Sequence, residues 1–394
     1  MILRELNIEK FRAIDSTHLS FEDALGRIQP ITVLAGPNGC GKTSILFAVI
    51  QALRGLMKYR TEDVPEPTDL DVRRGDNGNF ISLTPPEISV QLTLEFGDDE
   101  RQAIQDVWEC TESLRRAGTE ADTAIQGKKV TPEAVRLATW ANRPVVLNWK
   151  YPPALGTDGE RRPFWFVESV TPREAMHWFQ GRLYAIRGLQ RGLLKDSGLI
   201  DRIGGPMMFP QDRSLRARVT GLGSESVDPN RELTVWEILK ELGQRATSPN
   251  LPEQPSAAAL KDQAVKSENR IKELFAEICA PKEYVGFAYT PNDPLGSPYF
   301  KEGKSHYPLS MASSGEQVIL EYIVRLTFPN TLNHGLILID EPEVHLHPGW
   351  VRQLYRALPK LGQDNQFILT THSGELRSMA AEDGVLIDLG NLQD

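Results

Sequence analysis

Cysteine, long apolar runs and an excess of basic charge are all scarce in this chain of 394 residues. The three cysteines (Cys40, Cys110 and Cys279) are far apart and include no C-x-x-C pair. This pattern argues against a disulfide framework or a cysteine zinc site and fits a reducing compartment. No stretch approaches the ~18 consecutive apolar residues of a membrane-spanning helix, and residues 1–15 lack the apolar core of a signal peptide. The sequence therefore predicts a cytoplasmic protein with no membrane partner.

The charge balance excludes a general binder of polyanions. The chain has 44 basic and 53 acidic residues, a net charge of −9, so any contact with nucleic acid needs a local basic surface. The most basic stretch, residues 182–218, contains eight basic side chains: Arg182, Arg187, Arg191, Lys195, Arg202, Arg213, Arg216 and Arg218. Such a run is usually a solvated face. The alternative is a surface for a partner protein or nucleic acid.

A phosphate-loop motif at residues 36–43 is the strongest signal in the sequence. The apolar, β-branched run 31–35 predicts a buried strand, GPNGCGKT matches G-x-x-x-x-G-K-[ST], and an apolar helix is expected over 44–53. Glycines let backbone N–H groups turn toward an anion, Lys42 can reach the β- and γ-phosphates, and the Thr43 hydroxyl can bind Mg²⁺. The residues predicted to bind ATP here are Gly36, Pro37, Asn38, Gly39, Cys40, Gly41, Lys42, Thr43 and Ser44.

Two acidic residues follow a second buried strand. The run 336–339 is fully apolar and predicts a strand of the parallel type, which ends at Asp340 and Glu341. Asp340 is expected to hold Mg²⁺, and Glu341 is placed to orient or polarise the attacking water. Together with Lys42 they predict a Mg²⁺-dependent ATPase.

Two further segments carry weaker signals. Ser313 and Glu316 have the spacing of a capping box, which is enough to begin any helix. The apolar strand expected over 367–370 leads to His372. A histidine after a strand is often only structural, although its charge would respond to a nearby phosphate.

The order of these segments resembles the RecF/SMC branch of ABC-type ATPases. LNIEKFRAID at residues 6–15 is similar to the L-x-I-x-x-F-R-x-(F/I) opening of that branch, and SSGEQ at 313–317 is similar to its signature. EPEVHLHPGW at 341–350 matches the E-P-E-x-x-L-H-P run typical of the overcoming-lysogenisation-defect (OLD) ATPases.

The resemblance implies an α/β fold, a P-loop NTPase of the ABC-ATPase head type with a mixed sheet and helices. A long, mainly helical insertion would interrupt it. The expected division is an N-terminal part of the head at 1–96, the insertion at 97–299 and a C-terminal part of the head at 300–394. No heptad pattern lasts three or four turns, so the coiled-coil arms of SMC proteins are not expected.

Several roles follow from the resemblance alone. His372 corresponds to the switch histidine, which with Glu341 and Lys42 makes up the predicted catalytic set, and Arg12 is either a phosphate contact or an exposed arginine on an edge strand. The signature residues would contact the γ-phosphate held by the opposite subunit: Ser313, Ser314, Gly315, Glu316 and Gln317.

Other positions are left with open alternatives. Gln91 and Gln190 are both candidates for the glutamine loop of such ATPases, and neither has a convincing flank. His345 and His347 are interpreted as interface or structural residues, because two ligands do not make a zinc site.

The resemblance leaves three functions open. The first is an ATP-driven switch that dimerises through its heads and controls a separate effector, a nuclease or toxin, as in two-gene bacterial anti-phage systems. The chain ends 22 residues after His372, so no nuclease domain is expected to follow it. The alternative is a RecF-like clamp for DNA repair, with DNA as the partner. A transport subunit is disfavoured by the opening motif and the insertion.

Overall fold

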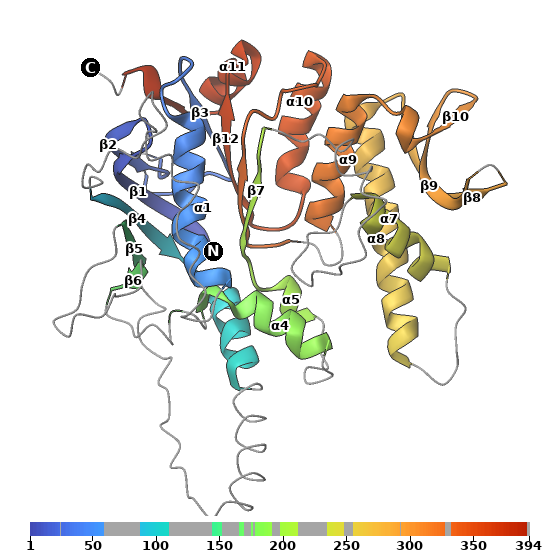
Figure 1. Cartoon of the computed structure of the whole chain (residues 1–394), viewed down its shortest axis with the longest axis horizontal. Coiled ribbons are helices and arrows are strands. Elements are labelled where there is room, and N and C mark those ends of the chain that lie inside the picture. Colours follow the sequence, from blue (N-terminus) through green and yellow to red (C-terminus); the bar gives the residue numbers. More distant parts are fainter. Residues whose placement is uncertain are drawn as a thin grey trace, which may run out of the picture.

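The computed structural model of the chain is a mixed α/β fold with three sheets (Figure 1). It describes residues 1–23, 25–58, 87–109, 144–151, 165–168, 175, 178–190, 198–211, 235–247, 255–291, 293–327 and 332–391. Within these ranges, no helix has the length and apolar composition needed to cross a bilayer.

The N-terminal sheet is antiparallel and has the strand order β2-β1-β4-β5-β6. Its strands are β1 (Ile2–Phe11), β2 (Ile14–Ser20), β4 (Ile88–Glu95), β5 (Val145–Tyr151) and β6 (Trp165–Val167). Burial alternates strictly along β4, as the alternation of apolar and polar residues in its sequence predicts. One face of this sheet therefore forms part of a core.

The second sheet is parallel and has the strand order β13-β3-β12-β11-β7. Its strands are β3 (Ile31–Ala35), β7 (Pro206–Phe209), β11 (Leu336–Ile339), β12 (Gln366–Thr371) and β13 (Leu386–Asp388). Because all five strands run in the same direction, their carboxyl ends meet at one edge of the sheet, where ligands of open α/β sheets bind. The loops after β3, β7, β11 and β12 are thus brought together.

The parallel sheet is the middle layer of the fold. On β11, Leu336 and Leu338 belong to one hydrophobic cluster, whereas Ile337 and Ile339 belong to the other. All four side chains are fully buried, and each contributes about 1.5–3 kcal/mol of hydrophobic free energy. The second face is covered by α8 (Pro255–Cys279), α9 (Ser314–Thr327), α10 (Pro348–Ala357) and α11 (Gly374–Glu382).

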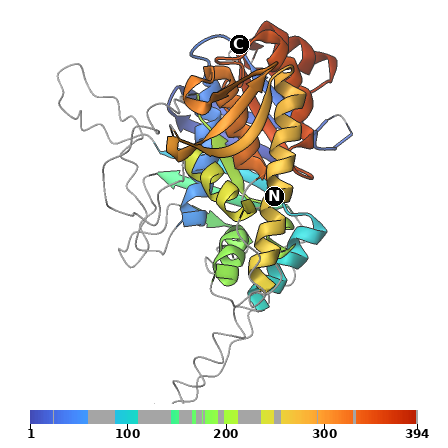
Figure 2. The ribbon, with the colours of Figure 1, turned by 90° about the vertical axis from the view of Figure 1, so that its right-hand side faces the viewer.

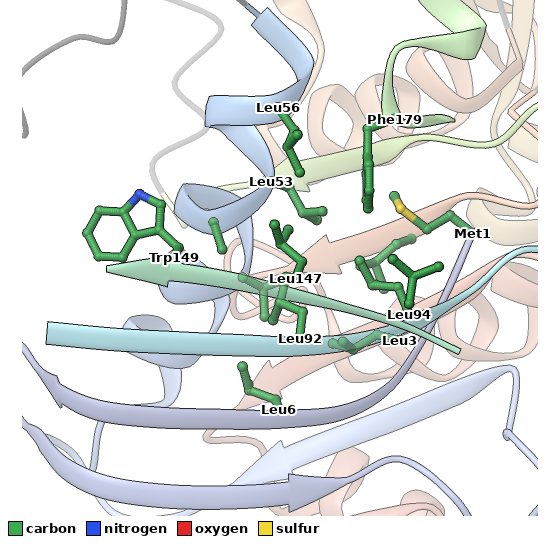
Figure 3. Packing of buried hydrophobic residues seen from close by; sticks show 14 of the residues in the cluster. Met1, Leu3, Leu6, Leu53, Leu56, Leu92, Leu94, Leu147, Trp149 and Phe179 are labelled. Atoms are coloured by element: carbon green, nitrogen blue, oxygen red, sulfur yellow. The ribbon is translucent and has the colours of Figure 1, made fainter. Parts of the chain in front are cut away.

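The first face is covered by α1 (Lys42–Lys58), the helix that follows the phosphate loop. It contacts β1, β4 and β5 on one side and β7 on the other. Figure 3 shows Leu53 and Leu56 of α1 packed over Leu92 of β4 and Leu147 of β5. This packing fixes the helix, and with it the loop at its start, between the two sheets.

The remaining described elements lie at the periphery. A helix at residues 98–109 follows β4, and α7 and α8 pack against each other and against α9. Figure 2 shows α8 running along this side of the molecule beside the third sheet, which is antiparallel and has the strand order β10-β9-β8. The other elements are α4 (Gly181–Gln190), α5 (Gly198–Asp201), α7 (Val235–Thr247), β8 (Glu283–Thr290), β9 (Asp293–Glu302) and β10 (Ser305–Pro308).

Three strands of the stretch 97–299 belong to the sheets of the head. The apolar runs at 144–151 and 163–170 predict strands within the insertion, but not their pairing with strands of the head. β5 and β6 extend the antiparallel sheet beside β4, and β7 pairs with β11 in the parallel sheet. Strand pairing is independent of distance along the chain, so the sequence order gave no sign of this arrangement. A division at residues 96 and 299 would cut both sheets.

Candidate functional site: the carboxyl edge of the parallel sheet

The predicted phosphate loop joins β3 to α1 and needs glycine at several positions. Gly39 and Gly41 have φ angles of 83° and 95°, which residues with a Cβ atom rarely adopt. A Cβ atom on Gly36 would lie 2.7 Å from Sγ of Cys40, which is too close. The helix begins where the N–H of Ile45 donates to the carbonyl of Gly41 (2.9 Å). The loop therefore ends at a helix N-terminus, which favours a bound anion.

Lys42 is buried beneath this loop and has only 5% of its surface exposed. Its ammonium donates to the carbonyl oxygens of Gly36 and Pro37, both at 2.9 Å. These bonds hold the charge on the inner side of the loop, where a phosphate cradled by the backbone N–H groups would meet it.

Asp340 directly follows β11 and lies beside the start of α1. The hydroxyl of Thr43 donates to both carboxylate oxygens of Asp340, at 2.9 and 3.1 Å. The hydroxyl of Thr370, from β12, donates to the same carboxylate at 2.5 Å. Thr43 and Asp340 are thus hard oxygen ligands held side by side, the donor type that Mg²⁺ prefers.

Glu341 is the most constrained acidic residue of the site. Its φ angle is 48°, and its backbone N–H donates to the hydroxyl of Thr370 (3.0 Å). Its carboxylate lies between two side chains: Nε2 of His372 is 2.9 Å from one oxygen, and Nε2 of Gln211 donates to the other at 2.7 Å. The pKa of Glu341 is raised, mainly because the carboxylate is partly buried. His372 lowers this pKa and the negative charge of Asp340 raises it, so the two partly cancel.

His372 connects the two halves of the site. It follows β12, and its ring lies between Lys42, whose ammonium is 3.5 Å from Nδ1, and the carboxylate of Glu341. The predicted switch histidine therefore lies beside the phosphate loop and beside the predicted base.

The sequence interpretation missed Gln211. This residue follows β7 by two positions, and the pairing of β7 with β11 brings it to Glu341. Gln91 instead hydrogen-bonds Asn7 and Asn148 within the antiparallel sheet, and Gln190 ends α4 with its side chain outside the described part. The available signal was a short apolar run between Gly205 and Pro210, which is typical of a brief strand.

The signature residues begin α9 and form a closed cap there. Ser313 and Glu316 hydrogen-bond each other as a capping box, with the Ser313 hydroxyl donating to the carboxylate at 2.5 Å. Glu316 also accepts from Tyr307 and from Lys282 (3.2 Å). Burial alone would raise the pKa of Glu316, but these hydrogen bonds outweigh it and lower the pKa. Gln317 donates to two backbone carbonyls just before the helix.

The outer surface of this cap is open to solvent. Ser313 and Ser314 are exposed, whereas Gly315 is buried against the segment that follows β11. A Cβ atom on Gly315 would lie 2.8 Å from the carbonyl oxygen of His345. The hydrogen bonds recorded for the signature, among the described residues, stay around its own helix start and do not reach the phosphate loop.

Arg12 and His347 make local contacts in the structure. Arg12 lies in the turn between β1 and β2 with a φ angle of 53°, and its guanidinium is 4.4 Å from the ring centre of Phe47 in α1. This is a cation–π contact near the start of the phosphate-loop helix. The Nδ1 atom of His347 accepts from the N–H of Gly349 (3.1 Å) and so caps α10. His345 has a φ angle of 70°.

Only part of the basic stretch can be placed. Arg182 donates to the carbonyls of Ile200 and Ile203 at 2.7 Å, and burial lowers the pKa of Arg182 to about 10. Arg202 pairs with Asp99 at 2.7 Å. These two arginines are structural. The side chains outside the described part are Arg187, Arg191, Lys195, Arg213, Arg216 and Arg218.

Comparison with known proteins finds two family models and several solved structures similar to this chain. Residues 5–139 match the family model described as "AAA domain", and residues 185–378 match the one described as "AAA domain, putative AbiEii toxin, Type IV TA system". Among solved structures, the SmcHead bound to the C-winged helix domain of ScpA aligns over 95% of this chain and 91% of that chain, with a TM-score of 0.50 and 14% identity. Both matching family models are thus AAA domains, and the fold is that of an SMC head.

Curated relatives match the chain over shorter stretches. The retron Ec83 probable ATPase of Escherichia coli is 42% identical over 74 residues, 16% of this chain and 14% of that protein. The retron Vc95 probable ATPase of Vibrio cholerae is 29% identical over 28% of this chain and 23% of its own length. The Septu protein PtuA of Bacillus mycoides is 35% identical over 19% of this chain and 11% of its own length. The matched parts thus span less than a quarter of these relatives.

Proposed function

We propose that this AAA-type ATPase binds and hydrolyses ATP with Mg²⁺ and uses the cycle to close and open a dimer of heads that controls a separate effector. The observation that carries the proposal is the meeting of six polar side chains at the carboxyl edge of the parallel sheet. They are Lys42, Thr43, Gln211, Asp340, Glu341 and His372. Their elements are far apart in the sequence. Contacts link Lys42, His372, Glu341 and Gln211 in one group and Thr43 with Asp340 in another. The hydroxyl of Thr370 joins the two groups, because it donates to Asp340 and accepts from the backbone N–H of Glu341.

In the proposed mechanism, the backbone N–H groups of residues 36–43 and the ammonium of Lys42 bind the β- and γ-phosphates. The oxygens of Thr43 and Asp340 would hold Mg²⁺, which when bound neutralises charge on the phosphates. Arg12 lies against the same helix and is proposed to contact the nucleotide from the side of the β1–β2 turn.

Glu341 is proposed to orient and polarise the attacking water. A raised pKa makes its carboxylate a stronger base than a solvated one. Gln211 and His372 bind one oxygen each, so the carboxylate has a fixed direction. His372 would also stabilise negative charge that develops on the γ-phosphate.

The signature is proposed to complete the ATP site of a second copy of the chain. Ser313 and Ser314 are exposed at the start of α9, where hydroxyls and a helix N-terminus favour a phosphate. A two-fold dimer would then contain two composite sites, each with a phosphate loop from one subunit and a signature from the other. ATP would favour the closed dimer because it binds that state better than the open one.

The proposed effector is a nuclease or toxin of a bacterial anti-phage system, and the proposed location is the cytoplasm. Similarity to ATPases named for retrons, to Septu protein PtuA and to a family described with a toxin of a TA system supports this role. The E-P-E-x-x-L-H-P run supports an OLD-like assignment within the AAA-type ATPases.

A mixing experiment tests the composite site. Ser314→Glu places a negative charge where the γ-phosphate of the other subunit would lie, and an acidic residue in the first turn does not disfavour the helix. Lys42→Ala disables the phosphate loop instead. Each variant alone is expected to lose turnover. In an equimolar mixture half of the dimers are mixed, and each mixed dimer has one intact site out of two. The mixture should therefore regain up to about a quarter of the wild-type rate.

Two controls make the result decisive. Ser314→Ala removes the hydroxyl without adding charge, so it should lose less turnover than Ser314→Glu. The second control mixes wild-type protein with a variant that carries both changes. Its turnover should be no higher than that of the wild-type subunits alone, because no mixed dimer contains an intact site. If mixing the single variants restores nothing, although Ser314→Glu binds ATP and both variants stay folded, the shared site is wrong.

A further inference from the structure

Glu343 lies two residues beyond Glu341, in the turn between β11 and α10. Its charge contributes to the raised pKa of Glu341, but among the described residues its side chain forms no hydrogen bond or ion pair with the six side chains of the site. Its carboxylate instead receives three hydrogen bonds on a single oxygen, Oε1. The donors are the hydroxyl of Thr371 (2.6 Å), the backbone N–H of His372 (2.8 Å) and the backbone N–H of Ser373 (3.0 Å). All three lie at the end of β12.

This arrangement suits a carboxylate in particular. The two N–H groups immediately precede α11, whose first turn is capped by the hydroxyl of Ser373, and negative charge is favoured at such a helix start. Hydrogen bonds to a charged acceptor are about twice as strong as neutral ones. The turn is further closed by the N–H of Ser373, which also donates to the hydroxyl of Thr371 (2.9 Å). Glu343 therefore holds a rigid three-residue turn.

The turn carries the switch histidine. The ring of His372 is 36% exposed, so packing alone does not fix it, and its direction depends on the backbone from which it projects. We propose that Glu343 is a positioning residue for His372, which ties the end of β12 to the end of β11 so that the ring meets both Lys42 and Glu341. The inference rests on the proposed catalytic use of His372.

The second carboxylate oxygen provides a matched variant. Oε2 of Glu343 is buried and has no hydrogen-bond partner among the described residues. Glu343→Gln can therefore keep an acceptor at the Oε1 position and put its amide nitrogen at the Oε2 position without breaking a bond. Glu343→Ala removes the acceptor altogether, and Thr371→Val removes one of the three donors with little change in shape.

The experiment is a double-mutant cycle in the full chain, with steady-state ATPase rates and nucleotide Kd measured for each variant. Glu343→Ala is expected to lower kcat by about tenfold or more, because a small misplacement of a reacting group is costly, while the nucleotide Kd changes by less than about twofold because the phosphate loop is untouched. Glu343→Gln should retain most of kcat, and Thr371→Val should fall between the two.

The double variant separates positioning from general damage. If Glu343 acts through His372, adding Glu343→Ala to His372→Ala should cause no further loss of kcat. Losses that multiply, or a Glu343→Ala enzyme with wild-type kcat, would overturn the inference. Full kcat in His372→Ala would instead overturn the proposed role of the histidine. If Glu343→Ala fails to fold, Thr371→Val replaces it in the same double-mutant cycle with His372→Ala, and the same outcomes support or overturn the inference.

Discussion

Two helices of this protein begin at a motif, yet the surroundings of the two helix starts differ. At the start of α1, Lys42 is buried and its neighbour Thr43 is bonded to Asp340, a residue almost 300 positions away. At the start of α9, the polar contacts of Ser313 run to Glu316 in the same turn, and the hydroxyl of Ser314 is exposed. The first helix start is built by tertiary structure, and the second by its own local sequence.

The difference separates what one chain can do from what needs a second copy. The start of α1 already faces its acidic and histidine partners, so nucleotide binding is expected of a single chain. The start of α9 is rigid, because Glu316 is buried and bonded to Lys282 and Tyr307, and it presents its outer surface to solvent. Changes at α1 should therefore affect binding, whereas changes at α9 should affect turnover alone.

The largest effect is expected for Lys42→Ala. The change removes charge-assisted hydrogen bonds worth about 1.5–3 kcal/mol each, so ATP affinity should fall at least about tenfold and turnover should be abolished. No apolar core packing is lost, so circular dichroism and the melting temperature should stay close to those of the wild type. Isothermal titration calorimetry measures the affinity. Wild-type affinity and turnover would contradict the assignment of the phosphate loop.

Glu341→Gln is expected to act on hydrolysis and to spare binding. Gln preserves the size of the side chain but lacks the basic carboxylate, so hydrolysis should slow by about 10²–10⁴-fold while ATP stays bound. Light scattering should then show a dimer, or a larger assembly of dimers, only when ATP is present.

The matched control for this dimer is Glu341→Gln combined with Lys42→Ala, which should stay unassociated at every ATP concentration. A Glu341→Gln protein that binds ATP tightly and remains a monomer would remove the link between nucleotide and closure. The difference drawn between the two helix starts would then lose its functional meaning.

The smallest effect on turnover is expected for Arg213, Arg216 and Arg218 changed together to Glu. These positions lie outside the described residues, and the prediction rests on the charge of the stretch. Basal ATPase should change by less than about twofold, while a salt-dependent contact with duplex DNA or with a co-purified partner should weaken. Arg202→Gln is the comparison, because it loses a pair with Asp99 within the fold. Lost ATPase in the triple variant would contradict a surface role.

Most of the nucleotide site could be predicted from contiguous residues. The spacing of residues 36–43 indicates phosphate binding, and Asp340 and Glu341 follow an apolar run that predicts a buried strand, as the structure shows. The structure brings these residues together with His372 as the motif order implied. A short motif is predictable when its backbone conformation and its ligand groups lie within one turn of chain.

The residues that the sequence did not reveal are the ones placed by strand pairing. Gln211 has no motif around it, and only the parallel pairing of β7 with β11 brings it to Glu341. Glu343 was read as part of a family motif, and its three hydrogen bonds to the end of β12 come from the neighbouring position of β11 and β12 in the sheet. The same cause places β5 and β6, which lie within the expected insertion, in the antiparallel sheet of the head.

The sequence by itself determined the phosphate loop, the buried strand before it and the capping box at the start of α9, because each depends on interactions within a few residues. Tertiary structure decided which strand ends share an edge, which glutamine meets the proposed base, and which carboxylate holds the histidine turn. Hydrogen bonds between strands and the burial of both faces of the parallel sheet fix these choices, and neither depends on how far apart the residues lie along the chain.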